Sequence, residues 1–240
     1  MTEMLFRADA YLRDAEAEVR GHTAEGGVIL DRTVFYPTGG GQPGDAGQLV
    51  WPGGALGIAT AVKGQGDEIV LVPSEPRPLP PVGTQVTQHL DWDRRYAHMR
   101  VHTALHLLSV AMPFGVTGGS ISAARGRLDF DMEDAPEDRD AIAGALAKLV
   151  ADDHVVSETW ITEAELDANP GLVKTLSVQP PRGAGRIRLV RIGSEAAPVD
   201  LQPCGGTHVA RTGEIGGLRL GKIEKKGRRN RRVYLHLEGA

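Results

Sequence analysis

The feature that most limits the fold of this chain is a change of hydrophobic pattern near residue 91. Before it, apolar residues occur in short runs, at 28–30, 69–72 and 85–90, between glycines and prolines. Such runs are typical of short strands joined by turns. After it, apolar residues recur with a helical period. The sequence therefore predicts an α+β chain, with a small, mostly β, glycine-rich domain over residues 1–90 and an α+β domain over residues 91–240, in which helices pack on an antiparallel sheet.

The first helix is expected between Asp91 and Pro113. A carboxylate such as that of Asp91 suits the first turn, because it faces the positive end of the helix dipole, and a proline ends the pattern. Two histidines, His102 and His106, lie to one side of the apolar stripe of this helix. The stripe is formed by residues at i, i+4, i+7 and i+11, which are Val101, Leu105, Leu108 and Met112.

Two further helices and several strands are expected after residue 130. One helix begins after Asp134, with Pro136 in its first turn. A short one begins at Thr162, because Glu165 stands three residues later in a capping-box spacing. Segments of strand character follow at 186–192, 199–201, 218–223 and 232–237, and a variable loop is expected at 178–185.

Composition limits the compartment and the chemistry of the cysteine. The chain has 240 residues, of which 41% are hydrophobic, enough for a substantial core. No apolar run approaches the roughly 18 to 20 residues of a membrane span, and the N-terminus carries charges where a secretory signal would be apolar. We therefore expect a cytoplasmic protein with no membrane partner, and the expected oligomeric state is a monomer. A single cysteine excludes an internal disulfide, so Cys204 is a buried apolar residue, a nucleophile or a metal ligand.

Four residues have the types and spacing of a metal site. His102 and His106 are one helical turn apart and can bind one ion, although His98, one turn earlier, can replace either of them. Cys204 precedes His208 by four residues, with two glycines between them that let the backbone wrap an ion. The sequence predicts one Zn²⁺ per chain, bound by this His, His, Cys, His set.

The same residues restrict the chemistry. Thr103 occupies the position at which a metalloprotease motif has its general-base glutamate, so a peptide bond is not the expected target. Four protein ligands are typical of a closed structural zinc site, whereas catalytic zinc keeps one position open. A purely structural zinc therefore stays an alternative.

Several segments, in this order, resemble the editing domain of alanyl-tRNA synthetase. They are DRTVFYPTGGGQPGD at 31–45, HTALH at 102–106, CGGTHV at 204–209 and TGEIG at 212–216. Because 240 residues leave no room for an aminoacylation domain as well, the chain is similar to the free-standing AlaX-type alanyl-tRNA editing proteins of medium length. This resemblance implies a β-barrel-like N-terminal domain, and zinc held by the residues that match the four ligands above.

The resemblance also implies the reaction. The substrate would be tRNA(Ala) whose acceptor end carries serine, or in some members glycine, and hydrolysis in trans would release the amino acid and free tRNA without ATP. An aminoacyl ester is already activated, so a polarised carbonyl, a positioned water and an oxyanion stabiliser suffice. We expect Gly40, Gly41 and Gln42 to surround the ester. Thr33 is expected in the pocket, where its hydroxyl would distinguish serine from alanine, although it can also be an ordinary strand residue. Asp45 can be functional or a turn residue that caps Gly44 or Gly47.

A basic run near the C-terminus offers a tRNA contact. Residues 222–232 carry seven basic side chains and one acidic one, a net charge of +6, so the rest of the chain sums to −10 within the total of −4. We expect residues 227–230 to form a hairpin tip, which is either merely solvated or contacts phosphates. The expected contacts are Lys222, Lys225, Lys226, Arg228 and Arg229. The rival functions are a non-catalytic tRNA-binding module with structural zinc and a metal-dependent hydrolase of a small ester.

Overall fold

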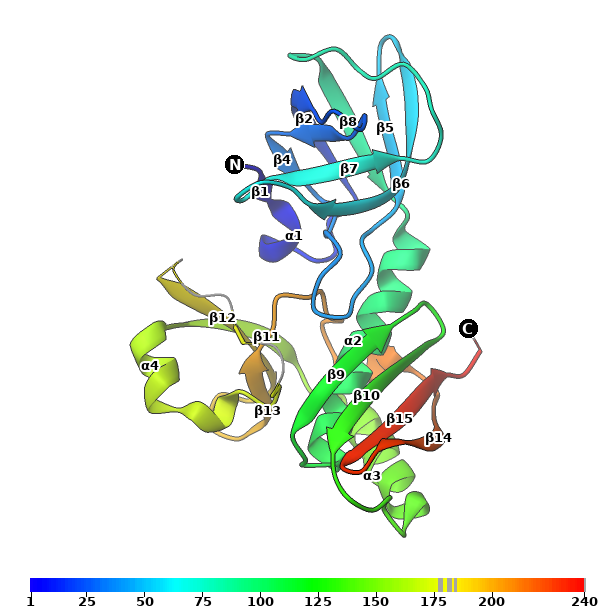
Figure 1. Ribbon diagram of the computed structural model, residues 1–240, viewed down its shortest axis with the longest axis vertical. Helices are drawn as coiled ribbons and strands as arrows, with labels where there is room; N and C mark the ends of the chain where they lie inside the picture. The colour runs from blue at the N-terminus through cyan, green and yellow to red at the C-terminus, as the bar shows by residue number, and fades with distance from the viewer. Residues whose placement is uncertain (177–178, 181–182, 184, 240) are drawn as a thin grey trace. The chain divides into compact units, whose positions relative to one another are not determined.

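The computed structural model describes residues 1–176, 179–180, 183 and 185–239, and the fold is α+β, as the sequence predicts (Figure 1). The chain folds into two compact units, Met1–Tyr96 and Ala97–Ala240. Among the described residues, no helix combines the length and apolar character that crossing a membrane requires. The predicted loop at 178–185 lies largely outside the described residues.

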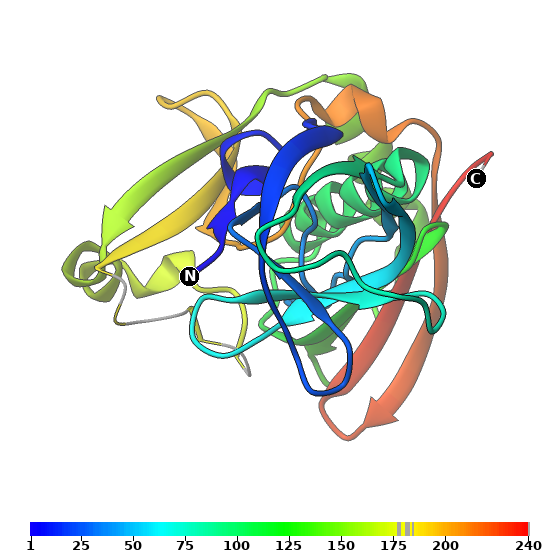
Figure 2. The ribbon, with the colours of Figure 1, turned by 90° about the horizontal axis from the view of Figure 1, so that it is seen from above.

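A closed six-stranded barrel forms most of the first unit, and the ring of blue and cyan strands is visible in Figures 1 and 2. All neighbouring strands in it are antiparallel. In ring order they are β2 (Asp14–His22), β3 (Val28–Leu30), β7 (Ile69–Pro73), β6 (Gly54–Lys63), β5 (Gly47–Trp51) and β8 (Gln85–Leu90). Alternate residues point inward, and Val19, Leu49 and Leu56 are fully buried in the resulting core.

Two short elements precede the barrel or lie beside it. Strand β1 (Glu3–Met4) pairs in parallel with β4 (Arg32–Thr33), and the single-turn helix α1 (Leu5–Ala8) follows β1. Phe6 of α1 is buried in the barrel core and contacts Tyr36 edge to face. The chain before the barrel is thus part of the same hydrophobic core.

The long helix α2 (Trp92–Ala111) confirms the predicted helix. The Asp91 carboxylate accepts a hydrogen bond from the Arg94 amide at 3.2 Å, which caps the first turn. The expected apolar stripe is buried, but so is every residue from 101 to 109, so the picture of a single stripe is incomplete. The reason is that two sheets of the second unit contact different sides of α2, and a helix covered in this way has no solvated face there.

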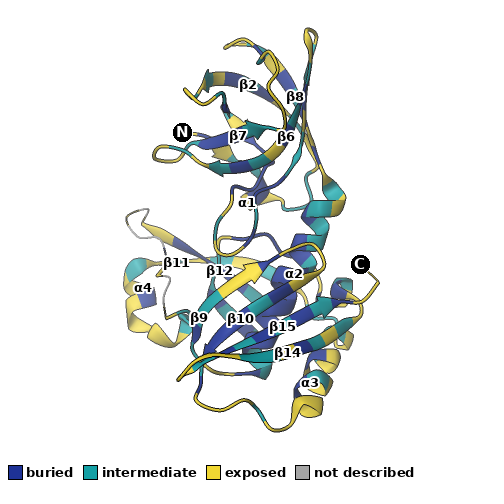
Figure 3. Ribbon diagram, turned by 45° about the vertical axis from the view of Figure 1, so that its right-hand side comes forward, coloured by how far each residue is buried: buried dark blue, intermediate teal, exposed yellow. Residues whose placement is uncertain are grey.

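A four-stranded antiparallel sheet contacts one side of α2. Its strands, in spatial order, are β14 (Leu218–Gly227), β15 (Asn230–Leu237), β10 (Arg125–Asp131) and β9 (Val116–Ile121). Gly126 permits the close approach, because a Cβ atom there would lie 2.6 Å from a methyl group of Val101. Along β15 every second residue is buried, which Figure 3 shows as alternating dark blue and teal.

A three-stranded antiparallel sheet carries residues that contact another side of α2. It consists of β11 (Val156–Thr162), β12 (Arg186–Gly193) and β13 (Pro198–Pro203), in that order. Helix α4 (Glu163–Ala168) and the 3₁₀ turn η1 (Pro170–Leu172) pack on one of its faces through Leu166 and Leu172. The predicted capping box of α4 is confirmed, since Thr162 and Glu165 bond each other's amides at 3.1 and 2.7 Å.

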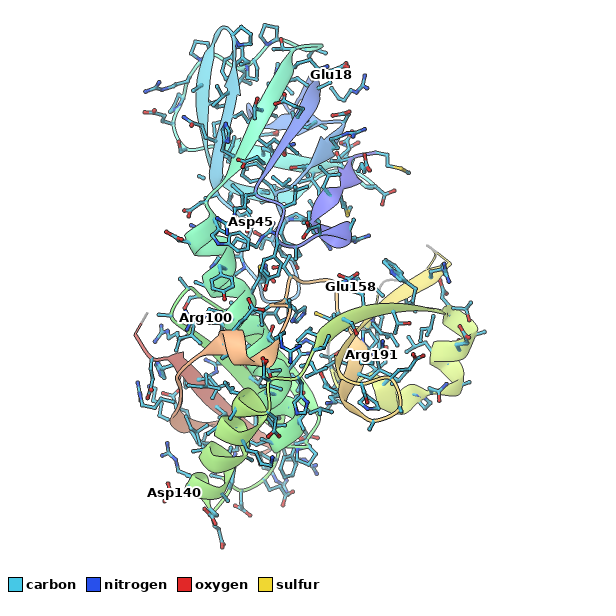
Figure 4. All side chains as sticks on the ribbon, turned by 180° about the vertical axis from the view of Figure 1, so that it is seen from behind. Glu18, Asp45, Arg100, Asp140, Glu158 and Arg191 are labelled. Carbon is cyan, nitrogen blue, oxygen red and sulfur yellow. The ribbon has the colours of Figure 1, made fainter. Side chains whose placement is uncertain are left out.

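Helix α3 (Arg139–Ala151) starts later than predicted. The Asp138 carboxylate accepts the Ala141 amide at 2.8 Å and sets the first turn, so Pro136 lies before the helix and not in it. Ile142 and Leu146 are buried as expected. Figure 4 labels Arg100 on α2, whose guanidinium donates to the Ile215 carbonyl and holds the 3₁₀ turn η2 (Thr212–Ile215) to this helix.

Candidate metal centre

The four residues expected to bind zinc lie together in the second unit. We call His102, His106, Cys204 and His208 the four-donor cluster, because one ligand atom from each lies within 4.8 Å of all the others. Helix α2 supplies two imidazoles one turn apart, and the loop after β13 supplies the thiol and the third imidazole. His98, the alternative ligand, is buried on the same helix but contributes no atom to this group of described residues.

The distances fit a tetrahedral zinc ion. With Zn–N near 2.0 to 2.1 Å and Zn–S near 2.3 Å, a tetrahedron places sulfur and nitrogen donors about 3.5 Å apart. The Cys204 Sγ atom lies 3.5 Å from His102 Nε2 and 3.3 Å from His208 Nε2. The three imidazoles are buried, and one soft and three borderline donors suit Zn²⁺.

Thr103 fixes the orientation of His208. Its hydroxyl donates to the Met99 carbonyl at 2.9 Å, so it can only accept from His208 Nδ1, which is 3.2 Å away. The proton of His208 is therefore on Nδ1, and the lone pair on Nε2 faces the cluster. The residue that distinguishes this helix from a metalloprotease helix thus sets a ligand's tautomer.

Asp200 orients His106 in a similar way. The carboxylate accepts from His106 Nδ1 at 2.9 Å, which leaves Nε2 for a metal. Lys174 Nζ and Gln202 Nε2 donate to the same carboxylate at 2.5 and 2.7 Å. Burial alone would raise the pKa of Asp200, but His106 and Lys174 hold that pKa well below its usual range. The aspartate is thus a fixed negative charge behind the ligand.

The ionisation of the cluster also favours a cation. Burial alone would raise the pKa of the Cys204 thiol, but the adjacent His102 and His208 imidazoles lower it well below its ordinary value. Burial and the charge of His102 lower the pKa of His208 to about 3. Burial would lower the pKa of His106, but hydrogen bonds to Asp200 and Cys204 raise it to about 9. Metal binding would therefore release a proton from His106.

Arg188 shapes the loop that carries the thiol. Its guanidinium donates to the carbonyls of Cys204 and Gly206 at 2.7 and 3.0 Å and forms an ion pair with Glu158. The Gly206 amide in turn points at the sulfur, 3.4 Å away. These bonds hold the backbone bent around Cys204, so its thiolate faces the imidazoles.

A cavity of about 400 Å³ lies next to the outer hydrogen bonds of the cluster. Ser109 and Lys174 line it, together with apolar residues such as Phe114 and Leu176. Lys174 bonds both Ser109 and Asp200. Lys174 is therefore partly exposed at this cavity, whereas Asp200 and Ser109 behind it are buried.

Comparisons with known proteins agree with this geometry. Residues 187–234 match the family model described as the Threonyl and Alanyl tRNA synthetase second additional domain, and residues 8–94 match that of tRNA synthetases class II (A). A protein named alanyl-tRNA editing protein AlaX-M from Methanosarcina acetivorans is 36% identical over 247 residues, which cover 99% of each chain. A protein of the same name from Saccharolobus solfataricus is 37% identical, over 98% of each chain. The chain belongs to the AlaX-type alanyl-tRNA editing protein family.

A longer relative fits the same assignment. The alanine–tRNA ligase of Pyrobaculum arsenaticum is 36% identical over 233 residues, which are 93% of this chain and 25% of the ligase. The AlaX-type chain therefore corresponds to one part of such a ligase.

The glycine loop of this AlaX-type protein, residues 38–47, lies in the first unit. Gly39 and Gln42 bond each other's backbone at 3.0 and 2.9 Å, so Gly40 and Gly41 form a two-residue turn. Both have positive φ, 58° and 81°, a conformation that glycine adopts without strain. The Gly39 amide is used inside this turn. Gln42 is fully buried.

Asp45, for which the sequence leaves a functional role and a turn cap open, forms a buried ion pair in the structure. Its carboxylate accepts the Tyr36 amide at 2.6 Å and pairs with Arg95. Both side chains of this pair are almost wholly buried. The remaining donors of Arg95 reach the carbonyls of Ala10 and Val34 at 2.9 and 2.6 Å, so the pair holds the glycine loop to its own unit.

Thr33 lies at the end of β4 and is 1% exposed. Its hydroxyl donates to Gln88 Oε1 at 2.7 Å and accepts the Phe35 amide at 3.1 Å. Gln88 Oε1 also accepts the Val34 amide, so a compact set of hydrogen bonds surrounds this residue in the first unit.

The five basic residues of the β14–β15 hairpin that are expected to contact tRNA are exposed, whereas Arg231 is buried. The predicted tip is confirmed by the pairing of Gly227 with Asn230. Figure 2 shows this hairpin in orange and red. Three of the five expected tRNA contacts have acidic partners: Lys222 and Lys226 pair with Glu224, and Arg229 pairs with Asp131. Among the described residues, Lys225 and Arg228 have no ion-pair partner. The positive charge of the tip is therefore smaller than the sequence count suggests.

Sequence reasoning missed the residues behind the ligands. Thr103 was read only as the absence of a glutamate, and Asp200, Lys174 and Arg188 were not singled out. One weak signal exists, because Asp200 and Cys204 are four residues apart in a short strand and its following loop. Nothing in the sequence indicates that β13 places Asp200 beside helix α2.

Proposed function

We propose that this protein hydrolyses the ester that joins serine, and secondarily glycine, to the acceptor end of tRNA(Ala). The observation that carries the proposal is the four-donor cluster. In it, His106 on α2 and His208 on the loop after β13 are each held with Nε2 toward a common point. The relatives named as alanyl-tRNA editing proteins support the class of substrate. Hydrolysis is assigned to the domain of residues 91–240, which carries the four-donor cluster.

Zn²⁺ is the ion that the donor set fits best. When bound, it would polarise an ester carbonyl or a water molecule. The chain's own part is to hold the donors: Asp200 keeps His106 in one tautomer, Thr103 does so for His208, and Arg188 bends the loop around Cys204. We propose further that the amides of Gly40 and Gly41 stabilise the negative charge that develops on the ester, whereas Gln42, which is fully buried, closes the turn through its backbone bonds to Gly39.

The tRNA backbone would be contacted by the β14–β15 hairpin. Lys225 and Arg228 are the best candidates, because their charges are not offset by an acidic neighbour among the described residues. Such contacts need positive charge but no base reading. Changing Lys225 and Arg228 to Gln should raise KM and reduce the salt dependence of activity, whereas the matched change of Lys222 and Lys226, which share Glu224, should do less. Equal effects of the two double variants would show that Lys225 and Arg228 are no more important for tRNA binding than Lys222 and Lys226.

The decisive experiment is a panel of mischarged tRNAs tested with purified protein. We expect release of serine from Ser-tRNA(Ala), slower release of glycine from Gly-tRNA(Ala), and no attack on Ala-tRNA(Ala). The His102→Ala variant should lose both bound zinc, by elemental analysis, and hydrolysis. Zinc-loaded protein that binds these tRNAs without hydrolysing them would favour a non-catalytic binding module. Hydrolysis of small esters without hydrolysis of the mischarged tRNAs would favour a metal-dependent hydrolase of a small ester.

A further inference from the structure

The sheet formed by β11, β12 and β13 has two different faces. Figure 4 labels Glu158 and Arg191, which belong to opposite faces of this sheet. The face of Arg191 also carries Ile187 and Leu189, which pack under helix α4. The other face carries Asp200 and the strand end that leads to Cys204, so it is the face that bears part of the four-donor cluster.

On that second face, three residues that are neighbours across the strands lead away from the four-donor cluster: Cys204, Arg188 and Trp160. The Cys204 amide donates to the Arg188 carbonyl at 3.3 Å, so these two residues are neighbours across β12 and the end of β13. Arg188 is in turn directly opposite Trp160 of β11. Because neighbouring strands are about 4.8 Å apart, Trp160 lies about 10 Å from Cys204, with its side chain on the same face.

The outer end of this row is uncovered. Val190 and Ile192, further along the same face, are fully buried, but Trp160 is 40% exposed. Arg186, the diagonal neighbour of Trp160 on the same face, is exposed as well. A single exposed apolar side chain is ordinary on a protein surface, so exposure alone carries no weight. The position matters, because Trp160 lies two strands and Arg186 one strand from the strand that leads to Cys204.

The exposed end of this row carries one basic residue, Arg186. Arg188 is paired with Glu158, so these two charges offset each other. Arg186 lies opposite Thr162 in the strand register and is exposed, and its positive charge is partly offset by the nearby carboxylate of Glu165. An aromatic ring beside a basic residue is the usual platform for an unpaired base and its phosphate.

We propose that the indole of Trp160 stacks on the base of the terminal, unpaired nucleotide of the charged tRNA, with Arg186 contacting its phosphate. This inference rests on the proposed function. The ester and the base are attached to the same ribose, so when the ester reaches the four-donor cluster the base must lie within one nucleotide of it. Trp160 is an exposed aromatic residue at that range on the same face.

The test uses the full-length, zinc-loaded protein and compares Trp160→Ala with Trp160→Phe. A stack formed equally in the ground and transition states contributes to KM and not to kcat. With Ser-tRNA(Ala), Trp160→Ala should raise KM about tenfold with kcat nearly unchanged, and Trp160→Phe should retain most of the affinity. Val155→Ala is the matched control, because Val155 is a similarly exposed apolar residue just before β11 and should change neither constant.

A binding measurement isolates the terminal base. Uncharged acceptor-stem minihelices with and without the last nucleotide serve as probes, measured by fluorescence anisotropy. Wild type should bind the complete one about tenfold more tightly, and Trp160→Ala should bind both alike. A wild-type KM and an intact preference in Trp160→Ala would refute the stack alone, as would a concentration-dependent dimer that this variant abolishes without a change in KM. Failure of the wild type to deacylate any of the mischarged tRNAs would remove the proposed function, and the stack with it.

Discussion

The two compact units both bury charged and polar side chains, but they satisfy them in different ways. In the first unit, Asp45 and Arg95 pair with each other, and backbone groups take up their remaining hydrogen-bonding capacity. In the second unit, a thiolate and the lone pairs of buried imidazoles face one another across 3.3 to 3.5 Å. The first set satisfies its own charges and hydrogen bonds, whereas the second brings four possible ligand atoms within 4.8 Å of one another.

This difference separates a structural polar cluster from a functional one. A buried pair of opposite charges that is fully hydrogen-bonded persists because removing either member leaves the other uncompensated. Ligand atoms that converge on one point must be held there by the residues around them, and a bound proton or cation offsets the charge of the thiolate. Asp200, Thr103 and Arg188 supply that support. Burial of polar groups alone would not have distinguished the two clusters.

The largest expected effect is that of metal removal. Treatment with a chelator, or the Cys204→Ala substitution, should reduce zinc from one ion per chain to none and abolish deacylation. At a zinc concentration 1,000 times Kd, loss of the ion should cost about 4 kcal/mol of stability. Hydrogen exchange should accelerate in α2 and around β13 but not in the barrel strands. Equal protection with and without chelator would show that the cluster does not need a cation.

The barrel unit should respond to a different change. Asp45→Ala leaves the Arg95 guanidinium buried without its partner, which should lower the free energy of unfolding by about 3 to 5 kcal/mol. Urea denaturation measures this, and the effect should be the same with and without chelator. Replacing both residues together, by Asp45→Leu and Arg95→Met, should cost less, because neither charge then remains. A loss below about 1 kcal/mol in Asp45→Ala would contradict the structural role given to this pair.

A smaller effect is expected behind the metal ligands. Asp200→Asn removes the negative charge that orients His106, and it should weaken zinc affinity about 10- to 100-fold in a competition titration with a chelator. Asp129→Asn is the matched control, because Asp129 is a buried carboxylate of the same unit that pairs with Arg232 and Arg127 and contacts no ligand. Its zinc affinity should equal that of wild type. The same loss of affinity in both variants would mean that the effect is a general one of lost charge.

The control variant has its own pH signature. Burial alone would raise the pKa of Asp129, but Arg232 and Arg127 lower it below the ordinary value. A carboxyl group with a depressed folded-state pKa stabilises the fold above its unfolded-state pKa and loses this effect as the pH falls through the folded-state pKa. Asp129→Asn should therefore be less stable than wild type near neutral pH, with a difference that shrinks in acid.

The smallest expected effect concerns Thr33, and it tests whether the barrel unit takes part in substrate choice. Thr33→Val keeps the shape but removes the hydroxyl that bonds Gln88 and Phe35, so stability should fall by about 1 kcal/mol. If the hydroxyl also recognises serine, the ratio of kcat/KM for Ser-tRNA(Ala) over Ala-tRNA(Ala) should fall as well. An unchanged ratio with reduced stability would show that Thr33 contributes to the stability of the fold and not to the recognition of serine.

Much of this protein follows from local sequence. The change of pattern near residue 91, the helix from Asp91, the capping box at Thr162 and the hairpin turn at Gly227 depend on neighbouring residues, and each appears in the structure. The spacing of His102 and His106, and of Cys204 and His208, likewise places each pair within reach of one ion. Boundaries were less predictable, as the start of α3 at Arg139 shows.

What the tertiary structure alone decided are the relations between segments far apart in the chain. The pairing of Asp45 with Arg95, the support of His106 by Asp200, and the place of Trp160 two strands from Cys204 each join residues separated by 44 or more positions. Periodicity and spacing describe which side of its own helix or strand a residue occupies. They carry no information on which other element packs against that side, because this depends on the register of the sheets and on the packing of the whole core.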